Sequence, residues 1–130
     1  MKYVAFYLGL GALFTHELDA MTNHEWRVLP LVRLLPEDVG MNVFLWLHVP
    51  LFAGIVALVA SRDARVRELT RAGIAAFLFV HGALHVLFRD DPAYEFATLA
   101  SDALIFGGAA LGLIYLVLDF ADRVRTGRTD

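Results

Sequence analysis

The sequence predicts an all-α membrane domain, a four-helix transmembrane bundle with both termini in the cytoplasm. The chain has 130 residues, enough for a single domain over 1–130. Hydrophobic residues make up 58% and charged residues only 19%, whereas soluble domains are about 45–50% apolar and about 25% charged. Four segments approach the length of about 17–25 mostly apolar residues that crosses a bilayer. Together these observations exclude a disordered chain and disfavour a soluble monomer.

The four spans are predicted at residues 3–21, 41–60, 72–88 and 96–118. The first carries three polar residues in its last third, the second is free of formal charge, and the fourth contains one acid. In chain order, the polar residues within the spans are His16, Glu17, Asp19, His48, His81, His85 and Asp102. In the fourth span, Gly108 and Gly112 have the small-xxx-small spacing that lets two helices approach closely.

Orientation follows from the basic residues, which accumulate on the cytoplasmic side of membrane proteins. The N-terminus, the loop between the second and third spans and the tail together hold eight Lys and Arg, and the two other loops hold three. Both termini are therefore predicted to be cytoplasmic. Ten Arg against one Lys, with many Ala, suggests a GC-rich bacterial genome, so we expect a multi-pass protein of the bacterial inner membrane. A cleaved signal peptide is the alternative for the first span, but the residues before Ala20 lack the small side chains of a cleavage site.

Several partner classes can be excluded or retained from composition. The absence of cysteine excludes disulfides, cysteine–zinc sites and thiol catalysis. The net charge of −3 argues against nucleic acid. The expected partners are the lipid bilayer and either a metal ion or a lipid-soluble small molecule. A homo-oligomer is left open.

The polar residues of the spans fall in one layer. With a rise of about 1.5 Å per residue and a hydrocarbon core of about 30 Å, six of them lie within about 10 Å of depth, in the outer half of the membrane. They are His16, Asp19, His48, His81, His85 and Asp102. Ionisable groups at such depth are costly and usually face the bundle interior, where they mark functional sites.

This layer predicts a metal site. His81 and His85 are spaced i, i+4, and His16 and Asp19 are spaced i, i+3, so each pair shares one helix face. With His48 from a further helix, these five residues are the candidate ligands of a divalent zinc or iron ion. Haem held between two histidines is a less favoured alternative. Asp102 and Glu17 are the candidate catalytic carboxylates, with Asp102 as a base or as a partner of the ligands.

Other interpretations of the same residues stay open. The protein is either a membrane-embedded enzyme or a non-enzymatic small transporter, proton relay or accessory subunit. The polar layer could also be a structural network that only holds helices together. His24 and Glu25, just beyond the first span, either cap the site or form a solvated loop beside Trp26, and the solvated loop is favoured.

Two stretches carry a family resemblance: Thr15-His16-Glu17-Leu18-Asp19-Ala20 and His24-Glu25-Trp26-Arg27-Val28-Leu29-Pro30. On these residues the chain resembles small bacterial membrane proteins of the HXXEE-motif family, with His16-x-x-Asp19-Ala20 in place of His-x-x-Glu-Glu. The resemblance implies a short helical membrane domain without an established activity. It also implies that His16 and Asp19 belong to the site.

Overall fold

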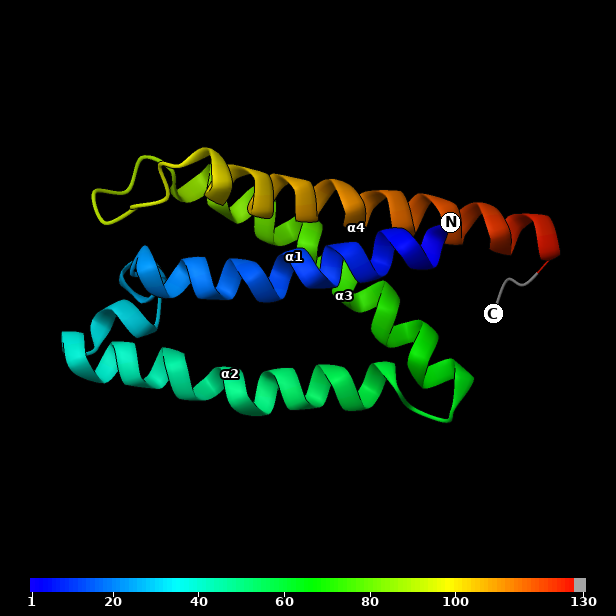
Figure 1. Ribbon diagram of the computed structural model, residues 1–130, viewed down its shortest axis with the longest axis horizontal. Coiled ribbons are helices and arrows are strands. Elements are labelled where there is room, and N and C mark those ends of the chain that lie inside the picture. The colour runs from blue at the N-terminus through cyan, green and yellow to red at the C-terminus, as the bar shows by residue number, and fades with distance from the viewer. Residues whose placement is uncertain (128–130) are drawn as a thin grey trace.

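The computed structural model describes residues 1–127, which form four long helices joined by loops (Figure 1). The helices are α1 (Lys2–Thr22), α2 (Glu37–Val59), α3 (Ala64–Phe88) and α4 (Leu99–Thr126). Two short 3-10 turns, η1 (Glu25–Arg27) and η2 (Val32–Leu34), lie between α1 and α2. The described residues contain no strand, so the all-α prediction is confirmed.

Helix capping places α3 and α4 differently from the predicted spans. α3 begins eight residues before the predicted span at 72, because Asp63 Oδ1 accepts hydrogen bonds from the backbone N–H groups of Arg65 (2.8 Å) and Val66 (3.3 Å). α4 begins only at Leu99, where the Thr98 hydroxyl accepts from the Ser101 N–H at 3.0 Å. It ends at Thr126, and the next residue, Gly127, has a φ of 66° that suits a residue without a side chain. Hydropathy marks the apolar part of a helix, whereas capping residues fix its ends.

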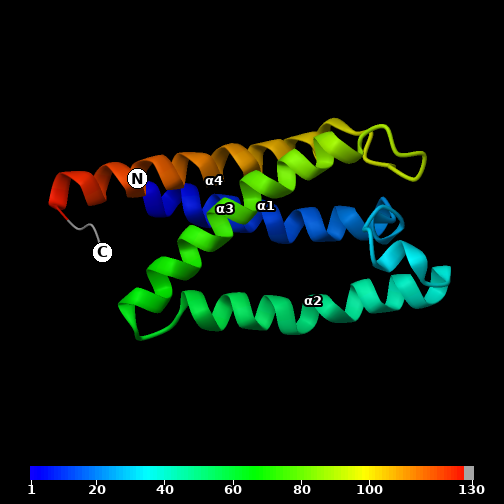
Figure 2. The same ribbon diagram turned by 180° about the vertical axis from the view of Figure 1, so that it is seen from behind.

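The core of the molecule is a three-helix unit in which α4 packs along both α1 and α3 (Figures 1 and 2). Glycines permit this close approach. A Cβ on Gly112 would lie 2.5 Å from the carbonyl oxygen of Ala75, and one on Gly82 would lie 2.8 Å from Ala109 Cβ. Gly108, one turn earlier on the same face, is also buried, and a Cβ there would lie 3.5 Å from Leu78. The predicted small-xxx-small contact is confirmed.

Helix α2 stands at the side of this unit and packs mainly on α3, η1 and η2 (Figure 2). Its link to α1 includes a tilted ring pair of Phe14 and Phe52, with centroids 4.4 Å apart. A second link joins His48 to Glu17. α2 leaves apolar side chains uncovered along most of its length.

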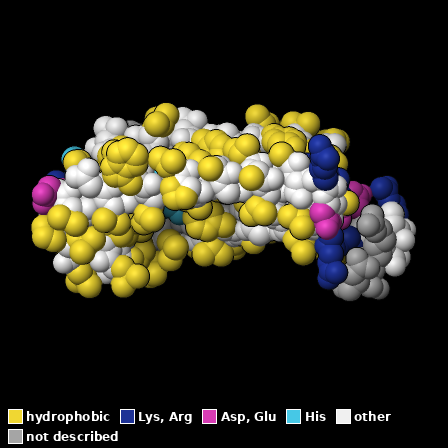
Figure 3. All heavy atoms as spheres, turned by 90° about the horizontal axis from the view of Figure 1, so that it is seen from below, with side chains coloured by type: hydrophobic (Ala, Val, Ile, Leu, Met, Phe, Trp, Pro, Cys, Tyr) yellow, Lys and Arg dark blue, Asp and Glu magenta, His cyan; other side chains and the backbone are white. Residues whose placement is uncertain are grey.

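The exposed surface is largely hydrophobic. In Figure 3, hydrophobic side chains spread over the face while Lys and Arg gather at the end that carries the N-terminus. Helices α2, α3 and α4 are each long and apolar enough to cross a membrane. α1 does not meet that measure, because His16, Glu17 and Asp19 lower its hydropathy. The four-span prediction is thus supported for three helices.

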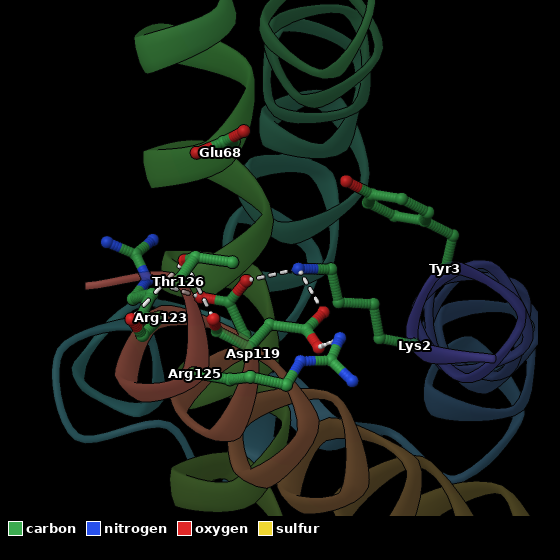
Figure 4. A pocket seen from close by; sticks show the side chains of 8 residues that line it. Lys2, Tyr3, Glu68, Asp119, Arg123, Arg125 and Thr126 are labelled. Atoms are coloured by element: carbon green, nitrogen blue, oxygen red, sulfur yellow. Dashed lines mark hydrogen bonds and ion pairs between the residues drawn. The ribbon is translucent and has the colours of Figure 1, made fainter. Parts of the chain in front are cut away.

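Ion pairs join the first and last helices at one end of the molecule (Figure 4). Lys2 Nζ lies 2.9 Å from Asp119 and 3.0 Å from Asp122, and Arg123 pairs with Asp119 at 2.8 Å. The N-terminus, the α2–α3 loop and the end of α4 all lie at this end, and the other two loops lie at the opposite end (Figures 1 and 2). The chain therefore passes along the long axis once per helix.

Candidate metal centre

Four side chains from three separate elements converge at the end of the molecule opposite the N-terminus and the end of α4 (Figure 1). They are His16 of α1, Glu25 of η1, and His81 and His85 of α3. Each offers one ligand atom, and these atoms all lie within 4.8 Å of one another. The set of three imidazoles and one carboxylate suits zinc or iron.

The separations within this cluster are close to those of a coordination shell. His81 Nε2 and His85 Nε2 are 3.1 Å apart. Glu25 Oε2 lies 3.6 Å from His16 Nε2, and Glu25 Oε1 lies 3.7 Å from His85 Nε2. Ligand bonds of about 2.0–2.1 Å in tetrahedral geometry put neighbouring ligand atoms roughly 3.3 Å apart. The four ligand atoms all lie within 4.8 Å of one another, so the wider pairs would close when a central cation is bound by all four.

The cluster is buried, and several of its polar atoms lack the hydrogen-bond partners that buried polar atoms normally have. His16 is 1% exposed, His85 4% and Glu25 5%. Neither ring nitrogen of His16 has a hydrogen-bond partner among the described residues, and neither does Glu25 Oε2. Leaving a buried polar group unsatisfied costs about 1–3 kcal/mol. One cation would satisfy several of these atoms at once.

Electrostatics keep the Glu25 carboxyl in the form that binds metals. Burial raises its pKa, but the facing imidazoles of His16, His81 and His85 lower it by more. The pKa of Glu25 therefore lies below its ordinary value, and the group is a carboxylate. A carboxylate among imidazoles is a ligand that needs no proton release on binding.

The local sequence explains how each ligand reaches the cluster. On α1, Leu13, His16 and Ala20 form one buried stripe at helical spacing. Beyond α1, His24 adopts a left-handed conformation (φ 51°, ψ 44°), which turns the chain back so that Glu25 and Trp26 are buried. The turn is held from outside, where the Trp26 indole N–H donates to Glu37 Oε1 at 3.1 Å.

Aromatic side chains enclose and orient the histidines. The Phe96 ring lies edge-on to His85, with centroids 4.8 Å apart, and also contacts His16 at 5.4 Å. His85 Nδ1 lies 3.1 Å from the Tyr94 hydroxyl. When Nδ1–H donates to this oxygen, the Nε2 lone pair is free to bind a metal. Tyr94 thus supplies the kind of outer partner that metal-binding histidines usually have.

The remaining predicted site residues lie outside this cluster. His48 donates through Nδ1–H to the Phe44 carbonyl at 2.7 Å, and its Nε2 lies 2.8 Å from Glu17 Oε2. Asp19 is partly buried, and its Oδ2 has no partner in the described part of the chain. Asp102 is in the first turn of α4, 3.7 Å from the Arg89 guanidinium. Of the five predicted ligands, the structure brings three together.

The solvated-loop interpretation of Glu25 is wrong. The depth of a residue in the membrane can be estimated from the helical rise only as far as the end of α1. Beyond it, the chain reverses at His24 and carries Glu25 back into the interior. His24 itself stays at the surface, with Nδ1 2.8 Å from Glu95 Oε2. The only signal in the sequence was an acid placed directly before a tryptophan, which buries readily.

The chain belongs to DUF6713, a family of unknown function, whose model matches residues 2–122. No curated protein matches the sequence significantly. No solved structure does so either. The match supports a small protein of a family without known function and does not confirm the resemblance to the HXXEE-motif type.

Proposed function

We propose that this member of DUF6713 is a multi-pass membrane protein whose buried cluster of His16, Glu25, His81 and His85 binds one divalent metal ion. The observation that carries the proposal is the convergence of four ligand atoms within 4.8 Å in an interior that leaves several of them without partners. A structural network alone would be expected to satisfy its own polar atoms.

Zinc and ferrous iron are the two ions that the ligand set favours. Imidazole nitrogens suit both, and one carboxylate keeps the shell compatible with either. Haem is disfavoured by geometry, because the three imidazole centroids are only 4.6–5.0 Å apart and leave no room for a porphyrin between two of them.

A small cavity beside the ligands supports an open coordination position. It measures about 30 Å³ and is bordered by Glu25, His81, His85 and Tyr94 together with apolar side chains. That volume holds one or two water molecules, since about 10–15 Å³ suffices for one. The four protein ligands complete a tetrahedral shell, so a bound water would be a fifth ligand, and a water ligand is typical of catalytic rather than structural metal sites. This favours an enzyme over a purely structural metal site.

The proposed membrane placement has four spans and cytoplasmic termini in a bacterial inner membrane. α1 has 21 residues, about 32 Å of helix, and buries His16 against the bundle rather than exposing it. The bias of Lys and Arg toward the end with the termini sets the orientation. On this placement the metal centre lies in the outer half of the membrane.

The experiment is metal analysis of the protein purified in detergent from metal-replete cells. We expect about one zinc or iron per chain. The variants His81→Ala, His16→Ala and Glu25→Gln should each lose most of it. His48→Ala and His24→Ala are matched controls, because both remove an imidazole that lies outside the cluster. Metal-free wild-type protein, or equal loss in the two controls, would overturn the proposal.

A further inference from the structure

A second feature, separate from the metal centre, is a groove between α1, α2 and α3. Its volume is about 290 Å³, and its lining includes Leu13, Glu17, Phe52, Ile55, Gly73 and Phe77. Glu17 is the one polar side chain of the lining. The groove exists because α2 stands away from the three-helix unit.

We propose that this α1–α2–α3 groove binds a neutral lipophilic molecule that carries a single hydroxyl, of the class of medium-chain to long-chain alcohols. The inference rests on the groove alone, so a metal-free protein would leave it standing. The volume is roughly twice that of the ~150 Å³ engineered cavity that holds benzene. It accommodates the first part of an alkyl chain, with the remainder in the bilayer.

Glu17 and its neighbour His48 form the polar end of the groove, which determines the polar group that a ligand can carry. His48 Nδ1 faces the Phe44 carbonyl, which can only accept, so that nitrogen carries a proton. His48 Nε2 lies 2.8 Å from Glu17 Oε2. A carboxylate ligand would bring an uncompensated charge into an apolar site, which is strongly unfavourable.

Glu17 remains able to accept a hydrogen bond from a ligand. His48 Nε2 approaches its Oε2 atom, and its side chain keeps 12% exposure. A hydroxyl on the ligand can donate to this carboxyl, whereas an alkane cannot. A hydrogen bond to a charged or partly charged group at this site corresponds to about a tenfold preference for the alcohol over the alkane.

The groove also leads toward the metal centre. Phe77 lines it, and the Phe77 ring lies against His81 with centroids 5.3 Å apart at 31°. Glu17 follows His16 directly in the sequence. The groove and the metal centre are therefore neighbours that meet at the contact between Phe77 and His81.

The experiment uses a photoreactive diazirine analogue of 1-dodecanol with the full chain reconstituted in lipid nanodiscs, followed by peptide mapping. We expect labelling in 51–55 and 73–77, displaced by 1-dodecanol about tenfold better than by dodecane or dodecanoate. Equal competition by dodecane would show that the groove is filled only by bilayer chains. Stronger competition by dodecanoate would contradict an apolar site that selects a neutral head group. Either result overturns the proposal.

Two variants make the assignment specific. Gly73→Leu places a bulky side chain in the groove at a position where a Cβ meets nothing within 4 Å, and it should abolish labelling. Gly107→Leu is the matched control, since Gly107 has equally open surroundings but does not line the groove. Glu17→Leu should keep the labelling and lose the preference for alcohol over alkane. Labelling that survives Gly73→Leu, or a preference that survives Glu17→Leu, would refute the inference.

Discussion

Replacing Gly112 with alanine should weaken the packing of α4 against α3, and the structure gives the size of the effect. A Cβ on Gly112 would lie 2.5 Å from the Ala75 carbonyl oxygen and 3.0 Å from Leu78 Cβ. The first contact is with backbone, which cannot rotate away. The helices must therefore separate locally to admit the methyl group.

Two contributions to the free energy of unfolding oppose each other in this variant. Overpacking of a tight contact costs about 1–3 kcal/mol. Alanine is intrinsically better than glycine inside a helix by about 1 kcal/mol. Gly107→Ala isolates the second contribution, because it lies in the same helix and its Cβ would meet nothing within 4 Å. The difference in stability between the two variants, about 1–3 kcal/mol, then measures the clash.

Reversible unfolding in mixed micelles provides the assay, followed by tryptophan fluorescence, to which the buried Trp26 and the exposed Trp46 both contribute. We expect Gly107→Ala to be as stable as the wild type or more stable, and Gly112→Ala to be the less stable of the pair. Equal stabilities of the two variants would show that α3 and α4 are not in the close contact described, and the reasoning would be refuted.

Three further predictions concern the loops and the orientation. The hydrogen bond from His24, assisted by Arg27, holds the pKa of Glu95 below its ordinary value of 4.5. The stability that this interaction contributes is present above about pH 4.5 and should be lost as the pH falls through the lower pKa that Glu95 has in the folded protein. In thermal melts, Glu95→Gln should therefore show a flatter dependence of stability on pH. Tyr94→Phe should lower metal affinity about 10-fold to 100-fold in a chelator competition, and unchanged affinity would exclude an orienting role for the phenol. Reporter fusions after α4 and in the α2–α3 loop should be cytoplasmic, and a fusion between α1 and α2 should be external; a cytoplasmic signal from the last would contradict the proposed orientation.

The helices and the histidine layer could be predicted because both depend on local spacing. His81 and His85 share a face by the i, i+4 rule, and His16 lies on the buried stripe of α1. Equal depth along separate helices then predicted correctly that His16 meets them. No contact between distant residues had to be known for these conclusions.

The ligand set as a whole could not be predicted, because depth does not fix direction. His48 lies at a similar depth to the other histidines, yet α2 stands apart, and its imidazole meets Glu17 instead. Glu25 depends on a left-handed residue at His24, a conformation that only a few per cent of non-glycine residues adopt, so it was not predicted. The positions of His48 and Glu25 both depend on how distant segments pack against one another, and the spacing of residues within one helix carries no information about that packing.

The most direct test of the metal centre is X-ray absorption at the metal edge of the protein as purified. A metal ion bound by the cluster should show a first shell of nitrogen and oxygen at about 2.0–2.1 Å, with the outer scattering of three imidazoles. His16→Ala should reduce the imidazole contribution by one, and His48→Ala should leave it unchanged. A spectrum with oxygen ligands and fewer than two imidazoles, or one that is the same in His16→Ala, would contradict a metal bound by the buried cluster.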